Sequence, residues 1–115
     1  MSESLEVKAE EFLVREGEES AQMYFLQEGT MAVFKIKGDR EQQVGTIYAG
    51  ELVGEMSFLD KQPRSASVKA VSDCKLTVIP HDKFEKFLDK QPSWYRALIN
   101  TLLDRLRRAN ARIKV

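Results

Sequence analysis

The sequence predicts a mainly β fold, a sandwich or roll of short strands, followed by two C-terminal helices. Apolar residues in the first two-thirds of the 115-residue chain come in short runs separated by turn residues. Many short strands at turn spacing are typical of sandwiches and rolls. After Pro80 the apolar period becomes that of a helix. The length is that of one domain with a modest core.

The expected strands follow one another along the chain and are bounded by residues that favour turns. They lie at 5–7, 12–14, 23–26, 31–36, 43–47, 66–70 and 76–79. Glu16-Gly17-Glu18 ends the second strand, and Tyr48-Ala49-Gly50 ends the fifth. Residues 37–40 predict a hairpin loop because they contain Gly38 and Asp39 between two apolar runs.

Two helices are expected over about 81–90 and 93–113. Phe84, Phe87 and Leu88 have the i, i+3, i+4 spacing of one helix face, and Pro92 ends that helix. Ser93 has the residue type of an N-cap for the second helix.

The second helix carries a heptad seam of apolar residues. Its members are Tyr95, Ile99, Leu102, Leu106, Ala109 and Ile113. A seam of this length exceeds what one small β domain covers, so it favours a homodimer through residues 95–113. The alternative is that the helix packs against its own β domain.

The charges of the chain balance, with 18 Lys and Arg against 18 Asp and Glu. A net charge of zero gives no overall electrostatic case for a nucleic-acid or membrane partner. A basic stretch near the C-terminus contains Arg105, Arg107, Arg108 and Arg112, but the aromatic residues lie elsewhere and offer these arginines no stacking platform. Nucleic-acid binding is therefore disfavoured.

His81 is the only histidine and Cys74 the only cysteine. One histidine cannot build a multi-histidine metal centre, so we expect no metal, no cofactor, no catalytic residue and no enzyme, including one of the cupin type. A single cysteine forms no internal disulfide, and a cytoplasmic location fits best. The N-terminus lacks the features of a signal peptide, and no apolar run is long enough to span a membrane.

The segment 50–70 contains the residue types of an anion site. Arg64 offers a planar fork of donors that matches phosphate oxygens. Gly54 lets the backbone approach a ligand, and a helical turn after Glu55 would present free N–H groups to an anion. Glu55 would repel a phosphate, so we expect it to accept a hydrogen bond from a sugar hydroxyl. Together these features indicate a nucleotide-like ligand.

Val53-Gly54-Glu55, followed nine residues after Glu55 by Arg64-Ser65-Ala66, resembles the phosphate-binding cassette of the cyclic nucleotide-binding domain family. That family includes catabolite activator proteins, regulatory subunits of protein kinase A and cyclic-nucleotide-gated channels. The resemblance covers the chain from about Leu5 onward. It implies one domain, 1–115, made of an eight-stranded antiparallel β-roll over about 5–79, a hinge helix and a longer C-terminal helix.

The resemblance also implies roles for individual residues. Glu55 would bind the ribose 2′-hydroxyl and Arg64 the cyclic phosphate, with help from backbone groups of the cassette. The further cassette residues are Gly54, Met56, Ser65 and Ala66. Val33 and Val44 match the family's apolar pocket lining, and Asn110 stands roughly where the long helix touches the purine.

The function implied is a regulatory sensor that binds a cyclic nucleotide and rearranges its C-terminal helices. Ser65 after Arg64 favours cyclic AMP over cyclic GMP, because a threonine there is associated with cyclic GMP in the family. The alternative is a degenerate domain of the same fold that serves as a dimerisation module without ligand. The output domain or partner protein is not in this chain, which is either free-standing or a module of a larger protein.

Overall fold

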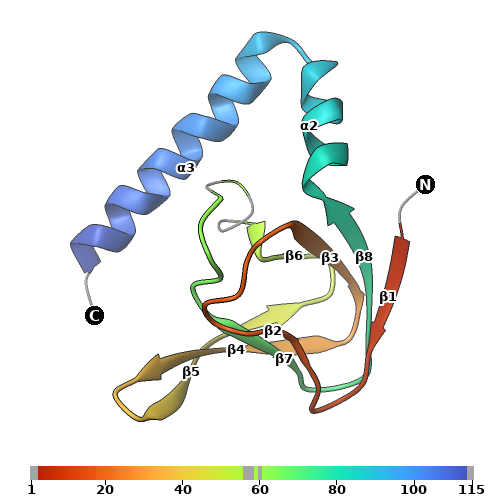
Figure 1. Ribbon diagram of the computed structural model, residues 1–115, viewed down its shortest axis with the longest axis vertical. Helices are drawn as coiled ribbons and strands as arrows, with labels where there is room; N and C mark the ends of the chain where they lie inside the picture. The colour runs from red at the N-terminus through yellow and green to blue at the C-terminus, as the bar shows by residue number, and fades with distance from the viewer. Residues whose placement is uncertain (1–2, 56–58, 60, 114–115) are drawn as a thin grey trace. The chain divides into compact units, whose positions relative to one another are not determined.

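The computed structural model describes residues 3–55, 59 and 61–113, with side chains as far as residue 109 (Figure 1). The described strands are β1 (Glu3–Val7), β2 (Phe12–Val14), β3 (Gln22–Glu28), β4 (Thr30–Lys37), β5 (Arg40–Tyr48), β6 (Leu52–Val53), β7 (Ser67–Ala70) and β8 (Cys74–Pro80). Two helices follow, α2 (His81–Asp89) and α3 (Ser93–Ile113). The predicted fold class, mainly β with two C-terminal helices, is confirmed.

The strands form two four-stranded sheets with the orders β1-β8-β3-β6 and β2-β7-β4-β5. Every pairing is antiparallel, as the β-roll requires. Strands far apart in sequence become neighbours: Met23 of β3 lies opposite Ile79 of β8, and Val33 of β4 lies opposite Val68 of β7. This winding brings segments from the whole length of the β unit together around one core.

The core draws on both sheets and anchors the two strands that flank the predicted cassette. Its largest fully buried side chains are Leu26, Met31, Val53 and Leu76. Burying a side chain of this size contributes about 1.5–3 kcal/mol. Val53 ends β6 directly before Gly54, and Val68 in β7 is buried shortly after Arg64. Both ends of the cassette are therefore fixed by core packing.

Residues 82–115 form a second compact unit, distinct from the β unit of residues 1–81. Within it, Nη1 of Arg96 on α3 lies 3.0 Å from Oε2 of Glu85, and Nη2 lies 3.1 Å from Oδ1 of Asp89. The rings of Phe87 and Tyr95 meet edge to face with centroids 6.5 Å apart. These contacts join α2 to the first turns of α3.

The predicted seam of α3 is partly open to solvent. Leu102 and Leu106 are 50% and 51% exposed, whereas Tyr95 and Ile99 are partly buried. Trp94 and Leu98 extend the exposed apolar face at four-residue steps. Within the described residues, neither helix combines the length and apolar composition that crossing a bilayer requires.

Candidate functional site

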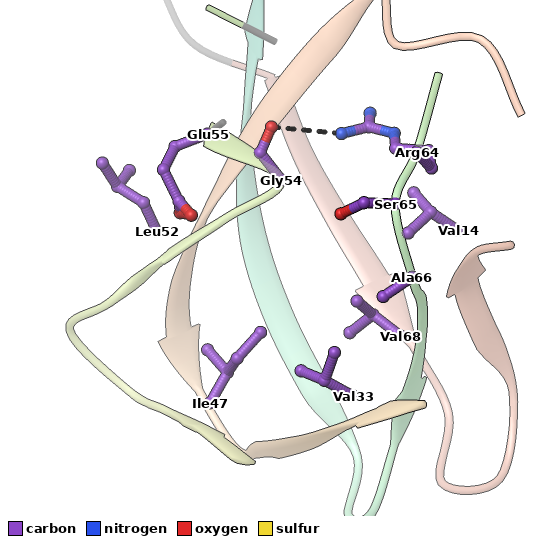
Figure 2. A pocket seen from close by; sticks show the side chains of 10 residues that line it. All are labelled: Val14, Val33, Ile47, Leu52, Gly54, Glu55, Arg64, Ser65, Ala66 and Val68. Atoms are coloured by element: carbon purple, nitrogen blue, oxygen red, sulfur yellow. Dashed lines mark hydrogen bonds between the residues drawn. The ribbon is translucent and has the colours of Figure 1, made fainter. Parts of the chain in front are cut away.

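A cavity of about 280 Å³ lies beside the segment that joins β6 to β7. This volume is close to the lower end of the roughly 300–1,000 Å³ of small-molecule sites. Its lining residues come from β2, β4, β5, β6, the cassette and β7 (Figure 2). They are Val14, Val33, Ile47, Leu52, Gly54, Glu55, Arg64, Ser65, Ala66 and Val68. Five of the predicted cassette residues are thus brought together at one cavity: Gly54, Glu55, Arg64, Ser65 and Ala66.

Arg64 is a buried cation at the edge of this cavity, with 5% of its surface exposed. Its guanidinium donates from Nη1 to the carbonyl oxygen of Gly54 at 3.3 Å and from Nη2 to that of Gln22. Cζ lies 5.9 Å from the ring centroid of Tyr24. Burial lowers the pKa of Arg64, whereas Tyr24 and Glu18 act in the opposite direction. An arginine nevertheless stays charged at neutral pH, so the site holds a positive charge with little water around it.

Gly54 is required at its position for two independent reasons. Its φ is +75°, in the left-handed region that side chains disfavour. A Cβ there would also collide with Nη1 of Arg64. The glycine therefore allows the guanidinium to lie directly against the backbone at the end of β6, as the dashed contact in Figure 2 shows.

Glu55 follows this glycine and lies at the same cavity as Arg64. Partial burial, chiefly, raises the pKa of its carboxyl group, and the charge of Glu51 raises it further. A hydrogen bond with its own main chain opposes both effects. A partly desolvated carboxylate is stabilised by a hydroxyl donor, which brings a hydrogen bond without a second negative charge.

The rest of the cavity wall is mainly apolar. The side chains of Val33, Ile47 and Val68 gather at one end, away from the guanidinium of Arg64, and Leu52 lies beside Glu55 (Figure 2). Ser65 presents its hydroxyl from the bend between Arg64 and β7 (Figure 2). An apolar wall opposite a cation and a carboxylate suits a ligand with one flat apolar end and one charged end.

Of the two valines expected to line the pocket, Val33 lies at the cavity, whereas the structure places Val44 elsewhere. Val44 is 47% exposed and is not among the described residues that line the cavity. The cause is a β-bulge: Gly45 pairs with Val33 while Gln43 pairs with Phe34, so Val44 has no partner of its own in the register. Ile47, two residues after Gly45, therefore points to the cavity instead.

Other lining residues were not predicted, although some had a signal in the sequence. Val68 alternates with Ser67 and Lys69 in the predicted strand at 66–70, and the side facing the core follows from that alternation. Val14 and Leu52 lie in very short strands, where alternation carries little information. Met56 and the side chain of Asn110 lie outside the described residues, so their predicted roles stay predictions.

The same holds for the helical turn expected after Glu55, of which the structure describes only Glu55 and Leu59, both helical. Among the residues that are described, no group of three or more His, Cys, Asp or Glu side chains is arranged to hold a metal ion.

A sequence model of the family described as "Cyclic nucleotide-binding domain" matches residues 4–91. The chain belongs to the cyclic nucleotide-binding domain family. Among its relatives is the potassium/sodium hyperpolarization-activated cyclic nucleotide-gated channel 4 of Homo sapiens, 35% identical over 98 residues. That match covers 85% of this chain but only 8% of the channel, so the chain spans a small part of this relative's length.

Solved structures with the same fold are also similar in sequence. The catabolite activator protein of Thermus thermophilus has a TM-score of 0.81 and 26% identity, covering 97% of this chain and 53% of that one. The cAMP-bound form of the EAL enzyme Bd1971 has a TM-score of 0.80 and 28% identity, covering 95% of this chain and 29% of that one. The cGMP-bound form of the same enzyme has a TM-score of 0.81 and 27% identity, with the same coverage.

Proposed function

We propose that this chain is a non-enzymatic sensor that binds a cyclic nucleotide, cyclic AMP in preference to cyclic GMP, in the cavity beside Arg64. The observation that carries the proposal is that Arg64 and Glu55 lie at one cavity with an apolar far wall. A cation, a hydroxyl acceptor and an apolar surface correspond to the phosphate, ribose and base of such a ligand.

Each part of the site has a proposed role. Arg64 pairs with the cyclic phosphate, and backbone groups of Gly54, Ser65 and Ala66 assist it. Glu55 accepts a hydrogen bond from the ribose 2′-hydroxyl. Val33, with Ile47 in place of Val44, packs on the purine. Met56 completes the cassette, and Asn110 on α3 contacts the purine edge with its amide, which can both donate and accept.

The preference for cyclic AMP depends on Ser65, which follows Arg64 where a threonine is associated with cyclic GMP in the family. The Bd1971 structures include a cAMP-bound and a cGMP-bound form, so a site of this fold accepts either purine. Selectivity is therefore a difference between two affinities rather than an exclusion of one ligand.

We further propose that the β unit and the helical unit act as a single domain over 1–115. Phosphate binding orders the cassette between β6 and β7, and the two C-terminal helices rearrange in response. A ligand shifts this equilibrium only by its differential affinity for the two arrangements. The output would then lie in a partner protein or in a larger protein that contains this module.

Calorimetric titration of the purified protein with cyclic AMP and with cyclic GMP tests the proposal. The expected result is saturable binding of both, tighter for cyclic AMP, and strong weakening of both by Arg64→Ala. Tighter binding of cyclic GMP would reverse the assigned selectivity. Absence of binding to either nucleotide would overturn the sensor function.

A second candidate is a domain of the same fold that mediates protein contacts without a nucleotide. The half-exposed Leu102 and Leu106 on α3 favour a partner for that helix, since isolated apolar side chains gain about 25 cal/mol per Å² on burial. The partner proposed is a second copy, through residues 95–113. Sedimentation should show a weak dimer that Leu106→Glu makes monomeric, and a monomer at hundreds of micromolar would exclude it.

A further inference from the structure

Three turns in the described part of the β unit share one hydrogen-bond pattern. They span residues 8–11, 15–18 and 48–51. The third residue of each has a positive φ, +77° at Glu10, +91° at Gly17 and +96° at Gly50. The fourth residue of each is a glutamate.

Each glutamate closes its own turn twice. Its backbone N–H donates to the carbonyl of the first residue, at 3.0, 3.1 and 3.1 Å in chain order. Its carboxylate Oε1 accepts from the N–H of that same first residue, at 2.9, 2.7 and 2.9 Å. A turn closed by both main chain and side chain has little freedom, so its remaining backbone groups point in fixed directions.

Two of those remaining groups bind both main-chain groups of a single residue in another segment, an arrangement that we call bracketing. The N–H of the turn's third residue donates to the carbonyl of the bracketed residue. The N–H of the bracketed residue donates to the backbone carbonyl of the turn's glutamate. The turn at 8–11 brackets Ala70 at 2.8 and 2.9 Å, and the turn at 48–51 brackets Leu26 at 2.8 and 3.0 Å. Ala70 and Leu26 are both fully buried apolar residues of the core.

The middle turn, 15–18, brackets Arg64 instead of a core residue. Gly17 N–H donates to the Arg64 carbonyl at 2.8 Å, and Arg64 N–H donates to the Glu18 carbonyl at 2.8 Å. Arg64 precedes β7, which begins at Ser67, so no sheet ladder holds it. Both of its main-chain groups are therefore fixed by this turn.

The same turn is tied to the strands around it. Glu16 N–H donates to Oγ of the buried Ser67 at 2.9 Å, and Oε1 of Glu16 accepts from the N–H of Ile36 on β4 at 3.0 Å. The connection then continues to Gln22, whose carbonyl accepts from Nη2 of Arg64. The segment 15–22, which runs from the end of β2 to the first residue of β3, thus holds Arg64 at its backbone and at its guanidinium.

We propose that the turn at 15–18 positions Arg64 for phosphate recognition and that Glu18 is the positioning residue that keeps the turn closed. The inference rests on the proposed function, in which Arg64 binds the cyclic phosphate. A bidentate contact depends on the angle of the guanidinium plane, which follows from where the arginine backbone is held. Glu18 is not among the residues that line the cavity beside Glu55, so its effect on a ligand there would pass through Arg64.

The test compares Glu18→Ala with Glu11→Ala, which removes the same carboxylate bond from the turn at 8–11. Two quantities are measured for each full-length chain: the affinity for cyclic AMP, and the affinity ratio of its two phosphorothioate diastereomers. Sulfur replaces one or the other non-bridging oxygen in these diastereomers, so their ratio reports the orientation of Arg64. Thermal unfolding midpoints measure how much each substitution destabilises the fold.

Both variants should lower the unfolding midpoint by similar amounts. Only Glu18→Ala should weaken cyclic AMP binding, about tenfold, and move the diastereomer ratio toward one, because only that turn holds the arginine. Glu18→Gln keeps an acceptor oxygen in the turn and should retain affinity within about threefold of the parent. Equal affinities for Glu18→Ala and Glu11→Ala, or an unchanged diastereomer ratio, would overturn the proposal.

A second pair of variants covers the case in which Glu18→Ala does not fold. Ser67→Ala removes the acceptor that ties Glu16 to β7. Ser72→Ala removes a bond of the same kind at an exposed serine, in which Ser72 Oγ accepts from Thr30 N–H at 3.1 Å. Only Ser67→Ala should shift the diastereomer ratio, and no shift would count against the proposal. A parent protein that binds no cyclic nucleotide would instead refute the proposed function itself, whatever the variants do.

Discussion

Two Gly-Glu dipeptides, Gly17-Glu18 and Gly54-Glu55, each make hydrogen bonds with Arg64 but use their carboxylates differently. Both glycines have positive φ, +91° and +75°. The Glu18 carboxylate accepts a hydrogen bond from Arg15 N–H at 2.7 Å within its own turn. The Glu55 carboxylate lies at the cavity, where partial burial raises its pKa. One glutamate stabilises a turn, and the other faces the place proposed for a ligand.

The glycines differ as well. A Cβ on Gly17 would meet nothing within 4 Å, whereas one on Gly54 would collide with Nη1 of Arg64. The first glycine is needed only for its backbone conformation, and the second also for the close approach of the guanidinium. The same dipeptide therefore belongs to a structural turn in one place and to the proposed binding site in the other, and both dipeptides contact Arg64.

The largest expected effect is that of removing Arg64. Arg64→Ala should weaken cyclic AMP binding by about 2–4 kcal/mol, because it removes a charge-assisted pair from a partly enclosed site. Arg64→Lys should recover only part of this loss, since an ammonium group lacks the planar fork. Calorimetric titration measures both. Unchanged affinity in Arg64→Ala would mean that Arg64 does not bind the ligand, and the proposed role of Gly54-Glu55 in a binding site would be lost.

The next largest effect separates the two glycines. Gly54→Ala should destabilise the protein by about 1–3 kcal/mol, because it combines strain at positive φ with displacement of the arginine. Gly38→Ala is the matched control, since Gly38 has φ +66° in the β4–β5 hairpin and open space around a Cβ. Chemical denaturation should show the smaller loss for Gly38→Ala and for Gly17→Ala. Equal losses at all three positions would mean that the contact with Arg64 adds nothing.

The sequence was sufficient for the fold class and for most of the cassette residues that meet at the cavity. Turn residues at short intervals predict the strands, and the change of period after Pro80 predicts the helices, because both signals are local. The cassette was recognisable because Gly54, Glu55, Arg64, Ser65 and Ala66 have informative residue types at fixed spacing. These residues also lie close together in the chain.

Features that depend on register or on distant pairing were not predictable. Because of the bulge at Val44, Ile47 rather than Val44 lies at the cavity. Nothing in the local composition indicates which residue of the strand is the unpaired one. The bracketing of Arg64 by Gly17 and Glu18 joins segments that meet only after both sheets have formed. The sequence places Glu16-Gly17-Glu18 after a strand, as the structure does, but carries no signal for the contact of Gly17 and Glu18 with Arg64.

A smaller effect tests whether Glu55 faces a hydroxyl. Glu55→Gln should lower the affinity for cyclic AMP by about 1–2 kcal/mol, and the affinity for its 2′-deoxy analogue by much less, because only the first ligand carries the hydroxyl. The same variant should flatten the pH dependence of binding, which in the parent strengthens as Glu55 ionises. Competition titrations with both ligands measure this. Equal losses of affinity for the two ligands would mean that Glu55 does not bind the ribose 2′-hydroxyl.

The smallest effect concerns the stability of the ligand-free protein as pH changes. Because the pKa of Glu55 is raised in the folded state, the folded protein binds more protons than the unfolded chain between the unfolded and folded pKa values. Stability therefore falls as pH rises through that window, and the cost is complete above the folded pKa.

Glu55→Gln removes this cost, so it should be more stable than the parent at neutral pH by about 0.5 kcal/mol, a modest figure because the carboxyl is only partly buried. The stability advantage of Glu55→Gln should shrink as pH falls toward the ordinary pKa range of a glutamate.

Glu18→Gln is the matched substitution in the other dipeptide. It replaces the charged acceptor of the Arg15 N–H by a neutral one and should slightly destabilise the protein. Urea denaturation of the three proteins across pH measures the differences. If Glu55→Gln is no more stable than the parent at neutral pH, the ionised carboxylate of Glu55 does not destabilise the folded protein. The two dipeptides would then differ in their glycines but not in the effect of their carboxylates on stability.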